Sequence, residues 1–159
     1  MEAAKEAADW PVIAAAVFGK EDCGNGFTYR THRTDRTVEV AGVSIDEMMK
    51  AAINAGADVI GAHCGVLLDI TDYLAIAEQI LASQHRPPQI PVIIQPNGSE
   101  TGRPLGGDTG KVRSRALADA VPEFFDRGIR LLGGCCGTTP ADIRAMAAAM
   151  RLHRRETRS

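Results

Sequence analysis

Two cysteines of this 159-residue chain are adjacent, Cys135 and Cys136, and a third, Cys64, lies far upstream. Cys64 ends the short apolar run Ala57–Cys64, and the adjacent pair directly follows the run Gly128–Gly134. Parallel strands end at the same edge of a sheet, so these runs would bring the three thiols together if they pair in parallel. Three thiolates around one Zn²⁺ leave the fourth tetrahedral position open, as in catalytic zinc sites. The alternative is that the cysteines are small buried core residues.

Four apolar runs predict the strands that would position these thiols. The runs are short, rich in β-branched residues and nearly continuous, which is typical of strands buried on both faces of a parallel sheet. They are Pro11–Phe18, Ala57–Cys64, Ile90–Pro96 and Gly128–Gly134. Helical patterns alternate with these runs, so we expect an α/β protein built from parallel βα units.

Short polar side chains mark where the helices begin. The expected N-caps are Ser44, Thr71 and Thr139, the last followed by Pro140 at the first helical position. Gly56 would end the first of these helices. A further helical segment, residues 114–127, contains Pro122, which must kink it or lie in the first turn of a shorter helix. Residues 2–8 also have a helical pattern.

The two longest connections predict where function lies. They are Gly19–Gly42 and Asn97–Lys111, and both follow the carboxyl end of a predicted strand. Folds of parallel βα units place their chemistry at that end of the sheet. We therefore expect two long loops there. The fourth cysteine, Cys23, falls in the first of them, and we expect it to stay outside the thiol cluster.

The bulk composition predicts one cytoplasmic domain spanning residues 1–159. A net charge of -2 gives no reason to propose nucleic acid or an anionic membrane as a partner. No apolar run approaches the roughly 20 residues that cross a bilayer, and the N-terminus lacks the layout of a signal peptide. In a reducing compartment the cysteines are thiols or thiolates, which leaves metal binding open.

Three segments carry a resemblance to a known family: "GADVIGAHCG", "PVIIQPNGS" and, above all, "GGCCGTTPADI". They are similar to the homocysteine S-methyltransferase family, which includes the zinc module of cobalamin-dependent methionine synthase and betaine–homocysteine methyltransferase. The resemblance runs over nearly the whole chain but matches only strands five to eight of the family's (β/α)8 barrel. It therefore implies half of a TIM-type barrel, with four strands.

The resemblance implies that Cys64, Cys135 and Cys136 bind zinc, in a zinc-dependent S-methyltransferase or its zinc-bearing half. The acceptor would be homocysteine or a similar thiol, held as a zinc thiolate that attacks an activated methyl group. The methyl donor stays open, and a methyl-corrinoid on a partner protein is one candidate.

Two further residues are candidates for substrate binding. Asn97 matches the family's asparagine after the third strand, although "PNGS" replaces the commoner "PNAG". His63 stands where the family usually has an asparagine before the cysteine. We expect His63 to pack between sheet and helix, because adjacent strand residues point to opposite faces. Contact with the substrate or the metal site is the alternative.

A four-stranded half barrel leaves its inner face and two edges uncovered. Two copies of the chain could close an eight-stranded barrel, or a separate polypeptide could supply strands one to four; the chain could also be a fragment. These options give an alternative function: a catalytically silent, zinc-stabilised subunit that complements a partner half barrel or docks a corrinoid protein. A plain folded fragment with buried thiols and no metal is a third interpretation.

Overall fold

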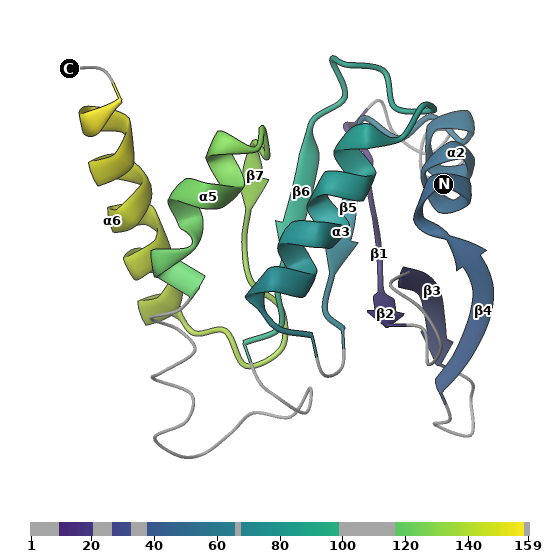
Figure 1. Ribbon diagram of the computed structural model, residues 1–159, viewed down its shortest axis with the longest axis horizontal. Helices are drawn as coiled ribbons and strands as arrows, with labels where there is room; N and C mark the ends of the chain where they lie inside the picture. Colours follow the sequence, from purple (N-terminus) through teal and green to yellow (C-terminus); the bar gives the residue numbers. More distant parts are fainter. Residues whose placement is uncertain (1–9, 21–26, 33–37, 66–67, 99–116, 158–159) are drawn as a thin grey trace.

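The computed structural model describes residues 10–20, 27–32, 38–65, 68–98 and 117–157 (Figure 1). Its main sheet has four parallel strands in the order β1-β5-β6-β7. These strands are β1 (Ile13–Ala16), β5 (Val59–His63), β6 (Val92–Gln95) and β7 (Leu131–Leu132). Each lies within one of the four apolar runs, so the predicted parallel sheet is confirmed.

Helices alternate with these strands along the described parts of the chain. They are α2 (Ile45–Asn54), α3 (Ile70–Ala82), α5 (Val121–Asp126) and α6 (Pro140–Glu156). Helix α3 lies across β5 and β6, and α6 lies beyond β7 at the edge of the molecule (Figure 1). The order is that of four βα units, which confirms the predicted half barrel. The predicted helix at residues 2–8 lies outside the described residues.

Two of the three predicted N-caps are confirmed and one is wrong. Ser44 and Thr139 each form a capping box with the residue three positions later. The second helix begins one residue before Thr71, because the carboxylate of Asp69 accepts a hydrogen bond from the Asp72 amide at 3.0 Å. Asp69 and Asp72 have the spacing of a capping box, and the Thr71 hydroxyl donates to Asp69 instead of capping the helix.

The proline in the third helical segment lies in the first turn of a short helix. Pro122 is at the start of α5, and the helical residues 117–119 before it are separated from α5 by a turn at Ala120. This position suits proline, because an amide in the first turn has no partner inside the helix. Gly56 has a φ of 80° just after α2, as expected for a residue that ends a helix.

The predicted long loop Gly19–Gly42 is wrong. The chain there forms a three-stranded antiparallel sheet of β2 (Phe18–Lys20), β3 (Phe27–His32) and β4 (Val38–Ser44). The stretch "VEVAGVS" is rich in valine, whose β-branched side chain favours strands. Charged residues and glycines around it masked that signal. The second predicted loop is described only at Asn97 and Gly98.

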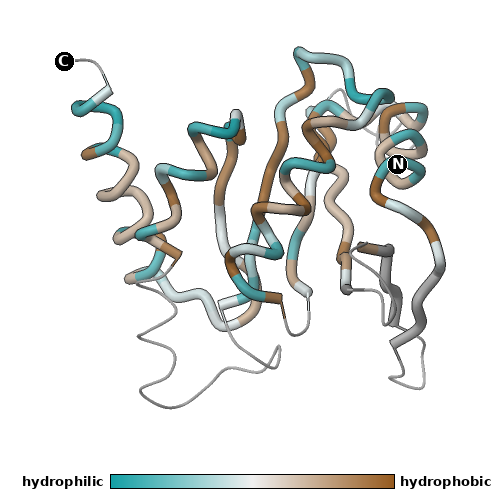
Figure 2. Tube along the Cα trace, in the orientation of Figure 1, coloured by the Kyte–Doolittle hydropathy of each residue, from teal (hydrophilic) through white to brown (hydrophobic). Residues whose placement is uncertain are grey.

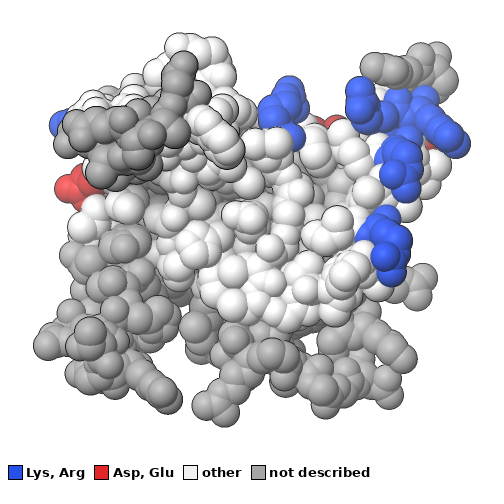
Figure 3. Space-filling view, turned by 180° about the vertical axis from the view of Figure 1, so that it is seen from behind, with Lys and Arg blue, Asp and Glu red and all other residues white. Residues whose placement is uncertain are grey.

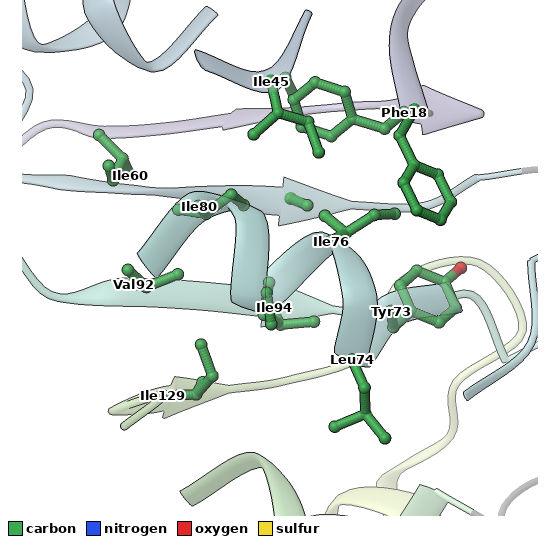
Figure 4. Close-up of a cluster of buried hydrophobic side chains, with 14 of the residues drawn as sticks. Phe18, Ile45, Ile60, Tyr73, Leu74, Ile76, Ile80, Val92, Ile94 and Ile129 are labelled. Atoms are coloured by element: carbon green, nitrogen blue, oxygen red, sulfur yellow. The ribbon is translucent and has the colours of Figure 1, made fainter. Parts of the chain in front are cut away.

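The two faces of the main sheet differ in what covers them. Alternate residues of β5 and β6 point toward α2 and α3 and form the core with Ile76 and Ile80 of α3 (Figure 4). The fully buried members on the strands are Ile60, Ala62, Val92 and Ile94. Figure 2 shows β6 among the most hydrophobic segments of the chain, whereas α6 ends in hydrophilic residues. These strands and helices therefore share the main core on one side of the sheet, and Val121 of α5 and Met146 of α6 belong to a second, smaller cluster.

The opposite face, the inner face of the half barrel, is partly open. Strand alternation places Ile13, Val59, Ile93 and Leu131 on this face. In the sheet register Ile13 pairs with Val59, and Ile93 pairs with Leu131 and with Gly61. Ile13 is 53% exposed and Leu131 is 38% exposed. Figure 3, seen from behind, shows few charged side chains across the middle of the molecule, while basic residues gather at the α6 edge. Among the described helices, none is long and apolar enough to cross a membrane.

Candidate metal centre

The three predicted cysteines converge at the carboxyl ends of the parallel strands. Cys64 directly follows β5, and Cys135 and Cys136 lie between β7 and α6. The Sγ atom of Cys136 is 3.7 Å from that of Cys64 and 3.9 Å from that of Cys135. All three sulfur atoms lie within 4.8 Å of one another, and all three cysteines are free. The three thiols therefore lie close together, as the sequence predicts.

These separations fit a tetrahedral thiolate site. With Zn–S bonds of about 2.3 Å, two sulfur ligands of a tetrahedral zinc lie about 3.8 Å apart. Two of the sulfur pairs, at 3.7 and 3.9 Å, are already close to that value. Sulfur ligands favour soft metal ions such as zinc over magnesium or calcium. Cys64, Cys135 and Cys136 could thus hold a metal ion with little rearrangement.

The backbone at Cys64 is held in an unusual conformation. Its φ is 55°, the left-handed region that a non-glycine residue adopts at a cost of roughly 1–2 kcal/mol. In a regular strand the Cys64 side chain would point into the helix layer, like those of Ile60 and Ala62. The left-handed turn breaks this alternation, while the Cys64 amide still donates to the Gln95 carbonyl at 3.0 Å. The strain lies at the residue that must aim its thiol at the cluster.

A buried tyrosine of α3 holds this strained turn. The Tyr73 hydroxyl donates to the Cys64 carbonyl at 2.9 Å and accepts from the Asn97 amide at 2.9 Å. Tyr73 is only 2% exposed. The sequence does not predict a role for Tyr73 at the site; the available signal was a polar-tipped aromatic among the apolar residues of "DYLAIAEQIL". Tyr73 therefore ties the end of β5 to the end of β6.

Asn97, a predicted substrate-binding residue, lies in the same network. Its side chain is buried, at 7% exposure, and its Nδ2 donates to the Gly65 carbonyl at 3.4 Å. This contact links the segments that follow β5 and β6. Asn97 thus lies in the hydrogen-bond network around the backbone of Cys64 and Gly65, and a substrate role remains a prediction.

The loop that carries the adjacent cysteines is shaped by backbone hydrogen bonds and glycine. The Cys135 amide donates to the Pro96 carbonyl at 2.9 Å, and the Gly98 amide donates to the Cys136 carbonyl at 2.8 Å. A Cβ atom at Gly134 would lie 2.3 Å from Oγ1 and 2.7 Å from Cβ of Thr138, so no larger residue fits there without movement. Gly137 has a φ of 78°, in the left-handed region that favours glycine. Glycines on either side of the pair therefore shape the loop that carries it.

His63 approaches the cluster from the inner face of the sheet. Its Nδ1 atom is 3.9 Å from the Cys135 Sγ atom, and the side chain is half-buried. The structure shows His63 in contact with the site, which was the alternative prediction. The expected packing of His63 between sheet and helix is not found. Burial lowers the pKa of His63. The imidazole is therefore neutral near pH 7 and carries one N–H.

The thiol cluster needs positive charge to become a set of thiolates. Burial raises the pKa of the Cys64 thiol to about 12, and the neighbouring Cys135 thiol acts in the same direction. At neutral pH the metal-free thiol of Cys64 therefore stays protonated. A divalent cation held by the three cysteines would supply the missing charge, because coordination deprotonates a thiol outright. Cys23, expected to stay outside the cluster, lies outside the described residues.

Fold and cluster together define an α/β half barrel with three thiols at the carboxyl end of its sheet. Residues 3–150 match the homocysteine S-methyltransferase family, and the chain belongs to this family. The resemblance inferred from "GGCCGTTPADI" and its companion segments is thereby confirmed. Each matched relative nevertheless extends well beyond the part that this chain covers.

Three relatives illustrate the match and its extent. The chain is 35% identical over 131 residues to methionine synthase of Mycobacterium tuberculosis, covering 78% of this chain and 10% of that protein. It is 30% identical over 111 residues to selenocysteine methyltransferase of Astragalus bisulcatus, covering 67% of this chain and 31% of that protein. Identity to homocysteine S-methyltransferase of Escherichia coli is 59% over 32 residues, covering 20% of this chain and 10% of that protein.

The chain also overlaps a solved structure. It covers 35% of the apo form of the homocysteine methyltransferase MmuM from Escherichia coli, with 70% of this chain matched. The TM-score is 0.48 and the sequence identity is 22%.

Proposed function

We propose that this chain is a zinc-dependent S-methyltransferase, or the zinc-bearing half of one, that transfers a methyl group to homocysteine or a similar thiol. The observation that carries the proposal is the spacing of the Cys64, Cys135 and Cys136 sulfur atoms, which fits three corners of a zinc tetrahedron. Among the described residues no fourth ligand joins this group. The open corner is the place for the acceptor thiol.

Zinc bound there would supply a Lewis acid that keeps the acceptor sulfur deprotonated at neutral pH. The residues of the chain orient that sulfur: the three cysteines fix the position of the open corner, and Tyr73 fixes the backbone of Cys64. In the transfer, the acceptor sulfur forms a bond to the methyl carbon while the bond between methyl and donor breaks. The donor keeps the electron pair of the broken bond, and the acceptor's proton goes to solvent. No basic side chain is required.

The names of the relatives support a thiol or selenol acceptor. They include methionine synthase, homocysteine S-methyltransferase and selenocysteine methyltransferase. The donor is left open between a sulfonium, a quaternary ammonium and a methyl-corrinoid on a partner protein. A panel of these three donors with homocysteine as acceptor tests the choice.

Metal analysis of the reduced protein tests the site itself. We expect about one zinc per chain, lost in Cys64→Ser and in Cys136→Ser because each removes one corner of the tetrahedron. Cys23→Ser is the matched control: it removes one thiol, and from the sequence we expect that thiol to lie outside the cluster. Reduced wild-type protein that takes up no zinc after supplementation would overturn the proposal. If Cys23→Ser lost zinc to the same extent, the assignment of Cys64, Cys135 and Cys136 as the ligands would be wrong.

The exposed apolar side chains of the inner face support completion of the barrel by further strands. Ile13 is 53% exposed and Leu131 is 38% exposed on this face. Covering apolar surface is favourable by about 25 cal/mol per Å². Four more strands would cover these side chains and would also pair the two edge strands of the sheet, β1 and β7.

We therefore propose that four more strands cover the inner face, from a second copy or from a complementary half-barrel subunit. The open face also favours the second candidate function, a catalytically silent zinc-bearing subunit that complements a partner half barrel or docks a corrinoid protein. Native mass spectrometry of the zinc-loaded chain separates these cases. A dimer with methyl transfer supports the enzyme, whereas a monomer that binds zinc and transfers no methyl group until a partner is added supports the subunit.

A further inference from the structure

Two consecutive residues at the end of β5 contact two consecutive residues of the loop after β7. Cys64 lies 3.7 Å from Cys136 between sulfur atoms, and His63 lies 3.9 Å from Cys135 between Nδ1 and Sγ. The left-handed backbone at Cys64 makes this pairing possible, because it lets neighbours on one strand serve the same cluster. His63 is therefore aimed at one particular sulfur atom.

The position of the imidazole is that of a neighbour of the site and not of a fourth ligand. In a tetrahedral zinc site an imidazole nitrogen lies about 3.6 Å from every sulfur ligand. His63 is absent from the group of described side chains whose ligand atoms all lie within 4.8 Å of one another. Its ring therefore stands to the side of the cluster, next to Cys135, and leaves the fourth corner to the acceptor.

We propose that Nδ1–H of His63 donates a hydrogen bond to the sulfur of Cys135 and makes His63 a positioning residue for the metal site. The inference rests on the proposed function, since it concerns Cys135 as a thiolate ligand. A hydrogen bond to a thiolate draws charge away from the sulfur and favours its deprotonated form. It also fixes the Cys135 rotamer in a loop that otherwise faces solvent.

The surroundings of His63 support this assignment. A neutral imidazole carries one ring N–H, on either Nδ1 or Nε2. A proton on Nδ1 faces a sulfur acceptor at 3.9 Å, within hydrogen-bonding range for sulfur. Hydrogen bonds from neighbouring side chains to metal ligands are typically worth 10–100-fold in metal affinity. The same range is expected here.

The test compares His63→Asn with His63→Leu in the full chain. The two side chains have nearly the same shape, and Asn carries an amide N–H on the atom that replaces Nδ1. We expect His63→Leu to bind zinc about 10–100-fold more weakly in competition with a chromophoric chelator. In the cobalt(II)-loaded protein its sulfur-to-metal charge-transfer band should move to longer wavelength, because the Cys135 thiolate loses a hydrogen bond. His63→Asn should restore both values toward wild type.

The control is His85→Leu, which removes a surface imidazole paired with Asp46 at 3.3 Å and should change neither reading. Equal behaviour of His63→Asn and His63→Leu would overturn the hydrogen bond. So would an imidazole ligand in the zinc X-ray absorption spectrum of the wild type, which would make His63 a ligand. If the wild-type protein binds no metal, the proposed function itself is refuted. If the wild type binds metal and His63→Leu has the same zinc affinity and the same cobalt band, only this inference is refuted.

Discussion

Replacing Tyr73 by phenylalanine tests whether the strained end of β5 is held by one hydroxyl group. The hydroxyl donates to the Cys64 carbonyl and accepts from the Asn97 amide, both at 2.9 Å, and the side chain is almost completely buried. Phenylalanine fills the same space and removes both hydrogen bonds. Each buried polar group that loses its partner costs about 1–3 kcal/mol. With two such groups, we expect Tyr73→Phe to lower the free energy of unfolding by about 2–6 kcal/mol.

The same substitution should weaken metal binding. Cys64 has a left-handed backbone, which costs roughly 1–2 kcal/mol and persists only when the surroundings hold it. Without the Tyr73 hydroxyl, the turn can relax toward an extended conformation that points the thiol away from Cys136. A free-energy change of about 1.4 kcal/mol corresponds to a tenfold change in affinity, so we expect zinc to bind roughly tenfold more weakly.

Urea unfolding of the metal-free protein and zinc titration against a chelator measure the two effects. Ile76→Val is the matched control, because Ile76 lies on the same helix, is fully buried and contacts the core without touching the hydroxyl network. It should cost about 0.5–1.5 kcal/mol and leave zinc affinity unchanged. If Tyr73→Phe behaves like Ile76→Val in both assays, the hydroxyl does not hold the site and the reasoning fails.

Three further predictions concern the strands, the last helix and pH. Gly61→Ala would place a Cβ atom 1.9 Å from the Ile93 carbonyl oxygen and should lower the free energy of unfolding in urea by at least about 3 kcal/mol. Thr139→Ala removes the N-cap of α6 and should cost about 1 kcal/mol by the same measurement, with zinc affinity unchanged. The pKa of Cys64 is raised in the folded, metal-free protein from 9.0 to about 12, so its contribution to stability is present below pH 9 and is lost as pH rises toward 12. Thermal melts of metal-free protein across that range should show the loss, and Cys64→Ser should reduce it.

The sequence predicts the parallel sheet well because its signal is local and redundant. Each strand is a nearly continuous apolar run, and the helices between them carry caps such as Ser44 and Thr139 at their starts. The antiparallel sheet of β2, β3 and β4 was missed because glycines and charged residues interrupt its alternation. The start of α3 was misplaced because Asp69 lies two residues before the expected cap Thr71, and it is the Asp69 carboxylate that reaches the Asp72 amide.

The sequence likewise predicts one part of the candidate site, the cysteines, and not the side chains around them. The three cysteines follow from strand ends and from the resemblance, since both place them at one edge. The contact of His63 with Cys135 could not be derived from alternation, because the left-handed φ at Cys64 breaks the period on which alternation depends. Tyr73 acts through a single hydroxyl on an otherwise apolar helix face, and no spacing rule singles it out.

The connections among the strands determine what closure of the barrel can affect. The Cys64 amide donates to the Gln95 carbonyl, and the Cys135 amide donates to the Pro96 carbonyl. The cysteine positions are thus fixed by β5, β6 and β7 alone, each bonded to its neighbour in the sheet. Metal affinity should therefore be nearly the same before and after the inner face is covered. We expect methyl transfer to depend on closure, because His63 beside the cluster lies on the inner face, where Ile13 and Leu131 are still exposed. A zinc affinity that rises steeply with protein concentration would contradict this separation, since it would show that the site itself needs the second half of the barrel.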